Sequence, residues 1–240
     1  MINAELLVGL PIRFNKYITI FPPTVKQMLA ENRLGLLYMN ILTNSQEELE
    51  DYWAKENFDG NAPTPWQDFI MKLDNEETRP IMLSALYFFT KTEFTYIRKL
   101  GKLLIGNLEE EVKRNTDIKD FKFFEEDDFF DFQNKIRMVC GVDQVKRPDP
   151  DEDPRVKRIK AKARYRDKIK AKQGKGTSFD TTLTAICCMG IGLTPLNVGE
   201  VSYASINSLI TMYQQKESFE FNQKLALAGA KNVSKKYWIQ

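Results

Sequence analysis

Hydrophobic positions recur at helical spacing along most of the chain, and several expected helix starts carry capping residues. Thr24 with Gln27 and Ser45 with Glu48 have the form of capping boxes, in which each side chain bonds a free backbone N–H of the first helical turn. Thr64 is followed by a proline, a residue that the first helical position tolerates well. The segment after it carries a full amphipathic stripe at Trp66, Phe69, Ile70 and Leu73. The pattern therefore predicts a helical body.

Strand-like patterning is confined to short stretches. Residues 10–21 alternate partly between apolar and polar positions around Asn15, which predicts a small β-hairpin. Residues 94–100 and 103–105 carry strand-forming residues on either side of Gly101. We expect two strands there, with a continued helix as the alternative.

A Phe-rich acidic segment follows at 121–132. As a helix from about 125, it would turn one set of residues inward: Phe129, Phe132, Ile136 and Val139. The simplest interpretation is a core helix with a solvated acidic face. The alternative is an acidic docking strip for a basic partner, including the basic segment of this chain.

The segment 146–176 divides the chain. It opens with three prolines and four acids among nine residues, a composition that neither a helix nor a central strand accepts. We therefore expect an N-terminal, mostly helical domain at 1–145, a charged linker at 146–176 and a C-terminal helical module at 177–240. The fold class is mainly α: a helical domain with a small β-hairpin, plus a small three-helix module.

The C-terminal module is expected to hold three short helices, beginning near Ser178, at Thr194 with its following proline, and near Phe219. Such a small core often needs a partner to complete it. The candidate partner-binding residues are Ile206, Ile210, Tyr213, Phe219 and Phe221. The alternative for each is a place in the core of the module.

Charge is distributed in opposed blocks, although the net charge of the 240 residues is only +2. Residues 155–175 hold eleven Lys or Arg against one acid, whereas 109–131 hold ten acids and four bases. The basic run predicts an exposed helix or a disordered linker, with an acidic protein surface, nucleic acid or an anionic membrane as alternative contacts. Its candidate electrostatic contacts are Arg155, Lys157, Arg158, Lys160, Lys162, Arg164 and Arg166.

Composition argues against an enzyme. The chain has no histidine, which removes Ser-His-Asp and Cys-His nucleophile systems and His-ligated zinc. Its three cysteines, Cys140, Cys187 and Cys188, lack a Cys-x-x-Cys spacing and predict neither disulfides nor a metal site. We expect no catalytic, metal or cofactor site. The start of the chain does not have the pattern of a signal peptide, and no apolar run is long enough to span a bilayer.

Two stretches resemble a known family. The segment 18–25, Ile-Thr-Ile-Phe-Pro-Pro-Thr-Val, is similar to the opening of proteins from the tail gene cluster of tailed bacteriophages of Gram-positive hosts. The region from Thr194 through Tyr203, Tyr213 and 221–229 to Trp238, with its Ala-Gly turn and aromatic-basic tail, resembles phage tail assembly chaperones. Together these stretches cover about a third of the chain.

The resemblance implies a non-enzymatic protein of the infected host's cytoplasm that is absent from the finished virion. Such chaperones are thought to coat the helical tape measure protein and to recruit tail tube subunits, often in a short and a frameshift-extended form. It implies many copies on one partner or a homo-oligomer, with no membrane contact. Two alternatives remain open from the sequence: a nucleic-acid-binding protein using 155–175, and a structural tail or connector component.

Overall fold

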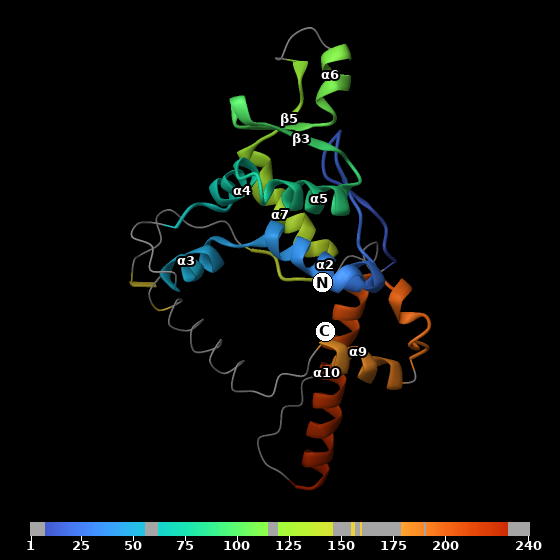
Figure 1. Cartoon of the computed structure of the whole chain (residues 1–240). Helices are drawn as coiled ribbons and strands as arrows, with labels where there is room; N and C mark the ends of the chain where they lie inside the picture. Colours follow the sequence, from blue (N-terminus) through green and yellow to red (C-terminus); the bar gives the residue numbers. More distant parts are fainter. Residues whose placement is uncertain are drawn as a thin grey trace. The chain divides into compact units, whose positions relative to one another are not determined.

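The structure is a computed structural model of the 240-residue chain, and it describes residues 8–55, 62–114, 120–145, 155, 156, 159, 179–189 and 191–229. The chain is mainly helical with small antiparallel sheets, as predicted (Figure 1). The α-helices are α2 (Val25–Thr43), α3 (Gln46–Lys55), α4 (Pro65–Asp74), α5 (Arg79–Thr90), α6 (Leu108–Arg114), α7 (Glu126–Val139), α9 (Phe179–Cys188) and α10 (Tyr203–Leu227). Among the described residues, no helix combines the length and apolarity needed to cross a membrane.

Contacts divide the chain into two compact units, one of Met1–Val145 with Gly199–Gln240 and the other of Lys146–Val198. This division places α10 with the N-terminal body, whereas the sequence pattern grouped 199–240 with the residues just before it. In the second unit, the described residues include α9. The first unit includes α10 and the helices α2 to α7.

Both expected strand regions form. The hairpin strands β1 (Ile12–Arg13) and β2 (Thr19–Ile20) pair antiparallel, and the Asn15 side chain turns the chain by accepting bonds from the backbone N–H groups of Tyr17 and Ile18, each at 2.8 Å. β3 (Phe94–Ile97) and β4 (Lys102–Ile105) lie on either side of a 3-10 turn, η1 (Arg98–Leu100), that ends at Gly101. The strand β5 (Phe123–Phe124), which the sequence did not predict, pairs with β4 and completes a sheet in the order β3-β4-β5.

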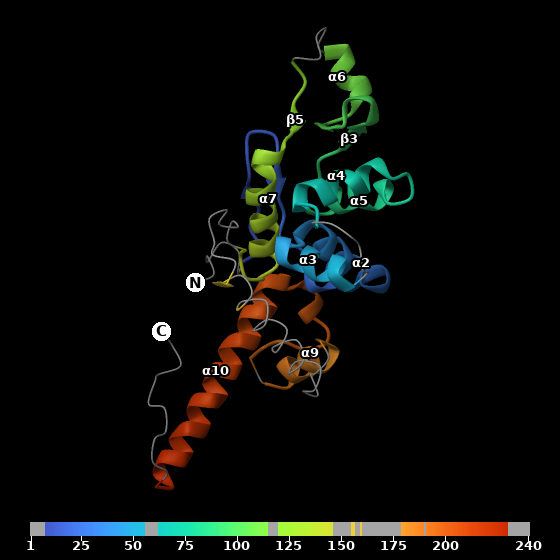
Figure 2. The same cartoon turned by 90° about the vertical axis from the view of Figure 1, so that its left-hand side faces the viewer.

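The core of the first unit lies among α2, α4, α5 and α7, which contact one another (Figures 1 and 2). Its centre is aromatic: Phe69 and Phe129 have ring centroids 4.7 Å apart, and Phe124 meets Phe132 edge-to-face at 5.1 Å. The inward set predicted for α7 is confirmed, since Phe129, Phe132, Ile136 and Val139 are all buried. The phenylalanines at 121, 124, 129 and 132 are therefore core residues rather than an exposed docking strip.

Both predicted capping boxes are present, and so is the predicted cap at Thr64. Thr24 and Gln27 exchange bonds at 3.2 and 2.9 Å, and Ser45 and Glu48 do so at 3.2 and 2.8 Å. Thr64 also forms a full box, at the start of α4. The sequence was sufficient to predict these caps, because the residues of a capping box are only three positions apart.

A break at residues 30–33 divides α2 into two helical segments. Ala30 is extended, and the next three residues, Glu31, Asn32 and Arg33, all have positive φ. Non-glycine residues in this left-handed region cost roughly 1–2 kcal/mol each. Gly35 follows the break, where an added Cβ would lie 2.6 Å from the Cα of Met28. The chain therefore needs glycine at this point to return so close to the first segment.

The C-terminal helices differ from those predicted. No α-helix begins at Thr194: residues 195–197 form a turn that leads to the 3-10 helix η3 (Val198–Glu200). The helix begins at Tyr203 with Ser202 as its cap, and it continues without a break through Phe219 to Leu227 (Figure 2). The second and third predicted helices are therefore one helix of 25 residues, since 214–219 holds no residue that ends a helix.

Candidate functional site

The start of α10 is anchored to the N-terminal body by backbone hydrogen bonds. The N–H of Val25 donates to the carbonyl of Val201 at 2.9 Å, and the N–H of Tyr203 donates to the carbonyl of Pro23 at 2.8 Å. These bonds surround an isolated antiparallel bridge between Thr24 and Ser202. The residues at the start of α2 thus also hold the start of α10 in place.

The end of α7 supplies a second anchor. Asn207 on α10 donates to the carbonyl of Cys140 at 2.9 Å. Gly141, with φ of +65°, packs so closely that an added Cβ would lie 2.9 Å from the Cα of Ala204. Burial raises the pKa of the Cys140 thiol well above its ordinary value. This cysteine is therefore a small apolar core residue rather than a reactive thiol.

Beyond these anchors α10 becomes exposed. We call residues 211–227 the distal α10 segment; within it only Tyr213, Phe219 and Asn222 are half-buried, and every other residue is exposed. Its exposed apolar side chains include Phe221 at 61%, Leu225 at 36% and Leu227 at 90%. An anchored helix that leaves large apolar side chains in water is a candidate contact surface.

The five residues predicted to bind a partner do not form one surface. Ile206 is completely buried, so it is a core residue that holds α10 to the body. Ile210 and Tyr213 are half-buried. At 100° per residue, Phe219 lies about 160° around the helix from Phe221. The structure thus leaves Phe221 as the exposed member of the set, whereas Phe219 is half-buried on the other side.

A row at spacing i, i+4 runs along the exposed side of α10 through Tyr213, Glu217, Phe221 and Leu225. The hydroxyl of Tyr213 donates to the carboxylate of Glu217 at 2.6 Å, and this hydrogen bond raises the pKa of Tyr213. Lys224 follows Phe221 by three residues on the same side, and it makes no ion pair within the described part of the chain. Phe221 and Leu225 therefore form an exposed apolar surface, and the cation Lys224 lies on the same side of the helix.

An aromatic groove of about 620 Å³ lies elsewhere on the first unit, between the break in α2, helix α5 and strand β3. This volume falls within the range of about 300–1,000 Å³ found for ligand sites. The rings of Tyr38 and Phe88 meet there with centroids 5.6 Å apart. The larger apolar side chains that line it are those of Leu34, Tyr38, Leu83, Tyr87, Phe88 and Phe94.

Three charged residues line the same groove. The Lys91 ammonium donates to the carbonyl of Phe88 at 2.8 Å and lies 5.2 Å from the centre of that ring and 5.9 Å from that of Tyr87. Partial desolvation lowers the pKa of Lys91 below the ordinary lysine value. Glu31 and Glu93 are exposed at the groove, and neither is ion-paired in the residues that the structure describes. No sequence pattern marks these positions, because the groove depends on the left-handed residues of α2.

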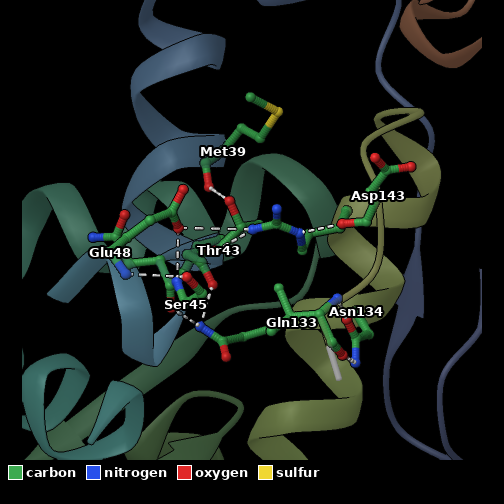
Figure 3. A network of polar contacts seen from close by, with 11 residues as sticks. Met39, Thr43, Ser45, Glu48, Gln133, Asn134 and Asp143 are labelled. Atoms are coloured by element: carbon green, nitrogen blue, oxygen red, sulfur yellow. Dashed lines mark hydrogen bonds and ion pairs between the residues drawn. The ribbon is translucent and has the colours of Figure 1, made fainter. Parts of the chain in front are cut away.

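A polar network at the end of α2 has a structural role (Figure 3). Gln133 donates to the carbonyls of Leu42 and Asn44 at 2.9 and 3.2 Å, and Arg137 donates to the carbonyl of Thr43 at 2.7 Å. The last carbonyls of a helix have no partner within the helix. The two α7 side chains therefore complete the end of α2.

The predicted electrostatic contacts lie mostly where the structure gives no description. Arg155 is helical and exposed, whereas Lys157, Arg158, Lys160, Lys162, Arg164 and Arg166 fall outside the described residues. In the described part of the chain, no group of His, Cys, Asp or Glu side chains could hold a metal ion. The described residues thus carry two candidate features, the distal α10 segment and the aromatic groove.

Comparison with protein-family models, with curated proteins and with solved structures finds no match for this chain. The features that bear on function are therefore these two surfaces and the sequence resemblance.

Proposed function

We propose that this protein is a non-enzymatic tail assembly chaperone of a tailed bacteriophage, acting in the cytoplasm of the infected host. Its partners would be the helical tape measure protein and, through recruitment, the tail tube subunits. The resemblance of the 18–25 and C-terminal stretches supports the phage assignment. The exposed apolar contact of Phe221 and Leu225 on an anchored helix is the single observation that supports partner binding.

The proposed mechanism is helix pairing. A tape measure helix carries an apolar stripe that must be kept from aggregating before the tail tube surrounds it. The distal α10 segment would cover part of that stripe with Phe221 and Leu225, in the way an amphipathic helix is bound through side chains at i, i+3 and i+4. Its own charges are balanced, with Lys216 and Glu220 paired at 3.6 Å, so apolar contact rather than net charge would determine affinity.

Co-expression with the product of a neighbouring gene that encodes a long helical protein tests the proposal. The tagged full-length chain should retain that protein, and Phe221→Ser should reduce retention at least tenfold, a loss of about 1.4 kcal/mol. Met212→Ser is the matched control, since Met212 is 46% exposed and lies on the opposite side of α10 from Phe221, about 180° away. Equal retention by both variants would contradict the proposed surface.

Two further measurements separate the alternatives. Retention of DNA or RNA that persists at physiological salt would favour a nucleic-acid-binding protein using 155–175, because phosphate contacts weaken steeply with added salt. Recovery of the protein from purified phage particles would favour a structural tail or connector component. Either result would overturn the chaperone assignment.

A further inference from the structure

Two exposed apolar surfaces of the first unit, the aromatic groove and the distal α10 segment, have complementary chemistry. The aromatic groove is an open apolar site that no residue of α10 lines. The distal α10 segment carries Phe221 and Leu225 on one side in water. Both surfaces expose apolar groups to water. Burying these groups against each other would stabilise a contact by about 25 cal/mol for each Å² of apolar surface removed from water.

The charges beside the two surfaces are complementary, since the two carboxylates at the groove outnumber its one cation, Lys91. Glu31 and Glu93 lie at the groove without an ion pair among the described residues. Lys224 lies beside Phe221 at i+3 and is likewise unpaired in that part of the chain. A Phe221 side chain seated in the groove would bring Lys224 toward these carboxylates. Such pairing sets orientation and encounter rate more than affinity.

The two surfaces cannot meet within one copy while α10 is continuous. Ile206 is fixed in the core, and Phe221 lies 15 residues further along, which is about 22 Å at 1.5 Å per residue. A rigid helix cannot fold back over that distance toward the body that anchors its first turn. An α10 segment that occupies the groove must therefore come from another molecule.

We propose that the distal α10 segment of one copy docks in the aromatic groove of a second copy, with Phe221 and Leu225 in the groove and Lys224 facing Glu31 and Glu93. The contact is heterologous, because one copy supplies the helix and the other supplies the groove. Such contacts join copies head to tail in rings or open chains. The contact stands on these observations alone; only its consequence, that a helical partner must displace the neighbouring copy from Phe221, rests on the proposed function.

Sedimentation of the full-length chain tests the contact without any partner. The interface is small, so weak association is expected, with a dissociation constant below about 100 μM. Phe221→Ser and Tyr87→Ser should each raise that constant at least tenfold. The matched controls, Met212→Ser and Tyr52→Ser, should leave it unchanged, since Tyr52 and Tyr87 are similarly exposed at 56% and 52% and Tyr52 does not line the groove.

Mixing the two defective variants gives the decisive result. One copy with an intact groove and one with an intact helix can form a single interface, so Phe221→Ser and Tyr87→Ser chains should together give a heterodimer and nothing larger. A wild-type chain that stays monomeric at about 300 μM would overturn the proposal. A mixture of the two variants that stays monomeric, or a Tyr87→Ser chain that associates like the wild type, would overturn it as well.

A charge exchange tests orientation. Lys224→Glu should weaken self-association, and adding Glu93→Lys in the same chain should restore part of it, because the complementary pair is recreated with reversed sign. No recovery with either Glu93→Lys or Glu31→Lys would contradict the placement of Lys224. Loss of tape measure binding with intact self-association would instead count against the proposed function alone, so the two failures are distinguishable.

Discussion

The side-chain amide of Gln133 donates a hydrogen bond of 2.9 Å to the carbonyl oxygen of Leu42, across 91 residues of sequence. The contact is buried, and a second bond of 3.2 Å from the same nitrogen reaches the carbonyl of Asn44. It joins the end of α2 to the middle of α7. The stability of this helix pair therefore depends in part on a buried polar side chain.

Replacing Gln133 with leucine should destabilise the protein by about 1–3 kcal/mol, because the two carbonyls lose their donor while they stay buried. Urea unfolding followed by circular dichroism measures the change. Gln223→Leu, at an exposed position of α10, should stay within about 0.5 kcal/mol of the wild type. A neutral Gln133→Leu would mean that water reaches these carbonyls.

Alanine at Gly35 should be poorly tolerated. Its Cβ would lie 2.6 Å from the Cα of Met28 and 2.9 Å from the carbonyl of Gln27, so backbone must shift, at a cost of about 1–3 kcal/mol or more. Gly199→Ala is the control, since its Cβ meets only the Cβ of Lys26 at 3.5 Å, an ordinary contact. Thermal melting of both variants should show a clear decrease for Gly35→Ala alone.

Substitutions at Ile206 and Phe221 should have different effects: the first should lower the stability of the fold, and the second should leave it nearly unchanged. Ile206 is fully buried, so Ile206→Ala should cost about 2–5 kcal/mol of unfolding free energy. Phe221 is 61% exposed, so Phe221→Ala should change that free energy by no more than about 0.5 kcal/mol. Denaturant titration at low protein concentration, where the chain is monomeric, measures both. A large loss for Phe221→Ala would show that the distal α10 segment packs within the folded monomer.

The three thiols should react at different rates. The thiolate is the reactive form, and burial raises the pKa of Cys140, so this thiol stays protonated near neutral pH. Cys188 is exposed and Cys187 half-buried. Ellman's reagent at pH 8 should label Cys188 in the native protein and reach Cys140 only after unfolding in denaturant. Cys140→Ser, which leaves Cys187 and Cys188 in place, should remove only the thiol that becomes reactive on unfolding. A fast third thiol in the wild type would show that the end of α7 opens readily.

Signals carried by neighbouring residues determined much of the local structure. The capping pairs, the hairpin at Asn15 and the inward face of α7 follow from contacts three or four positions apart, or from simple alternation. The mainly helical fold followed from the same patterns. The predicted break before Phe219 was wrong, because the apolar spacing changes there while no residue actually ends the helix.

The candidate surfaces were only partly visible in the sequence. Phe221 was recognised as a candidate contact, but the same pattern also selected Ile206, which is in the core. Periodicity identifies an apolar face without saying what covers it. The groove was missed, since Glu31, Lys91 and Glu93 have no spacing that marks a site.

The sequence by itself determined where α2, α3 and α4 begin, which faces are apolar and that the 240 residues contain no histidine. Only the tertiary structure decided that α10 is held by Pro23, Thr24 and Val25, that Gln133 completes the end of α2, and that left-handed residues in α2 form one wall of a groove. The physical reason is distance along the chain. Caps and turns are closed by residues a few positions apart. The contacts of Gln133 and of α10 with α2 join residues at least 89 positions apart, and only the packing of the whole unit brings such residues together.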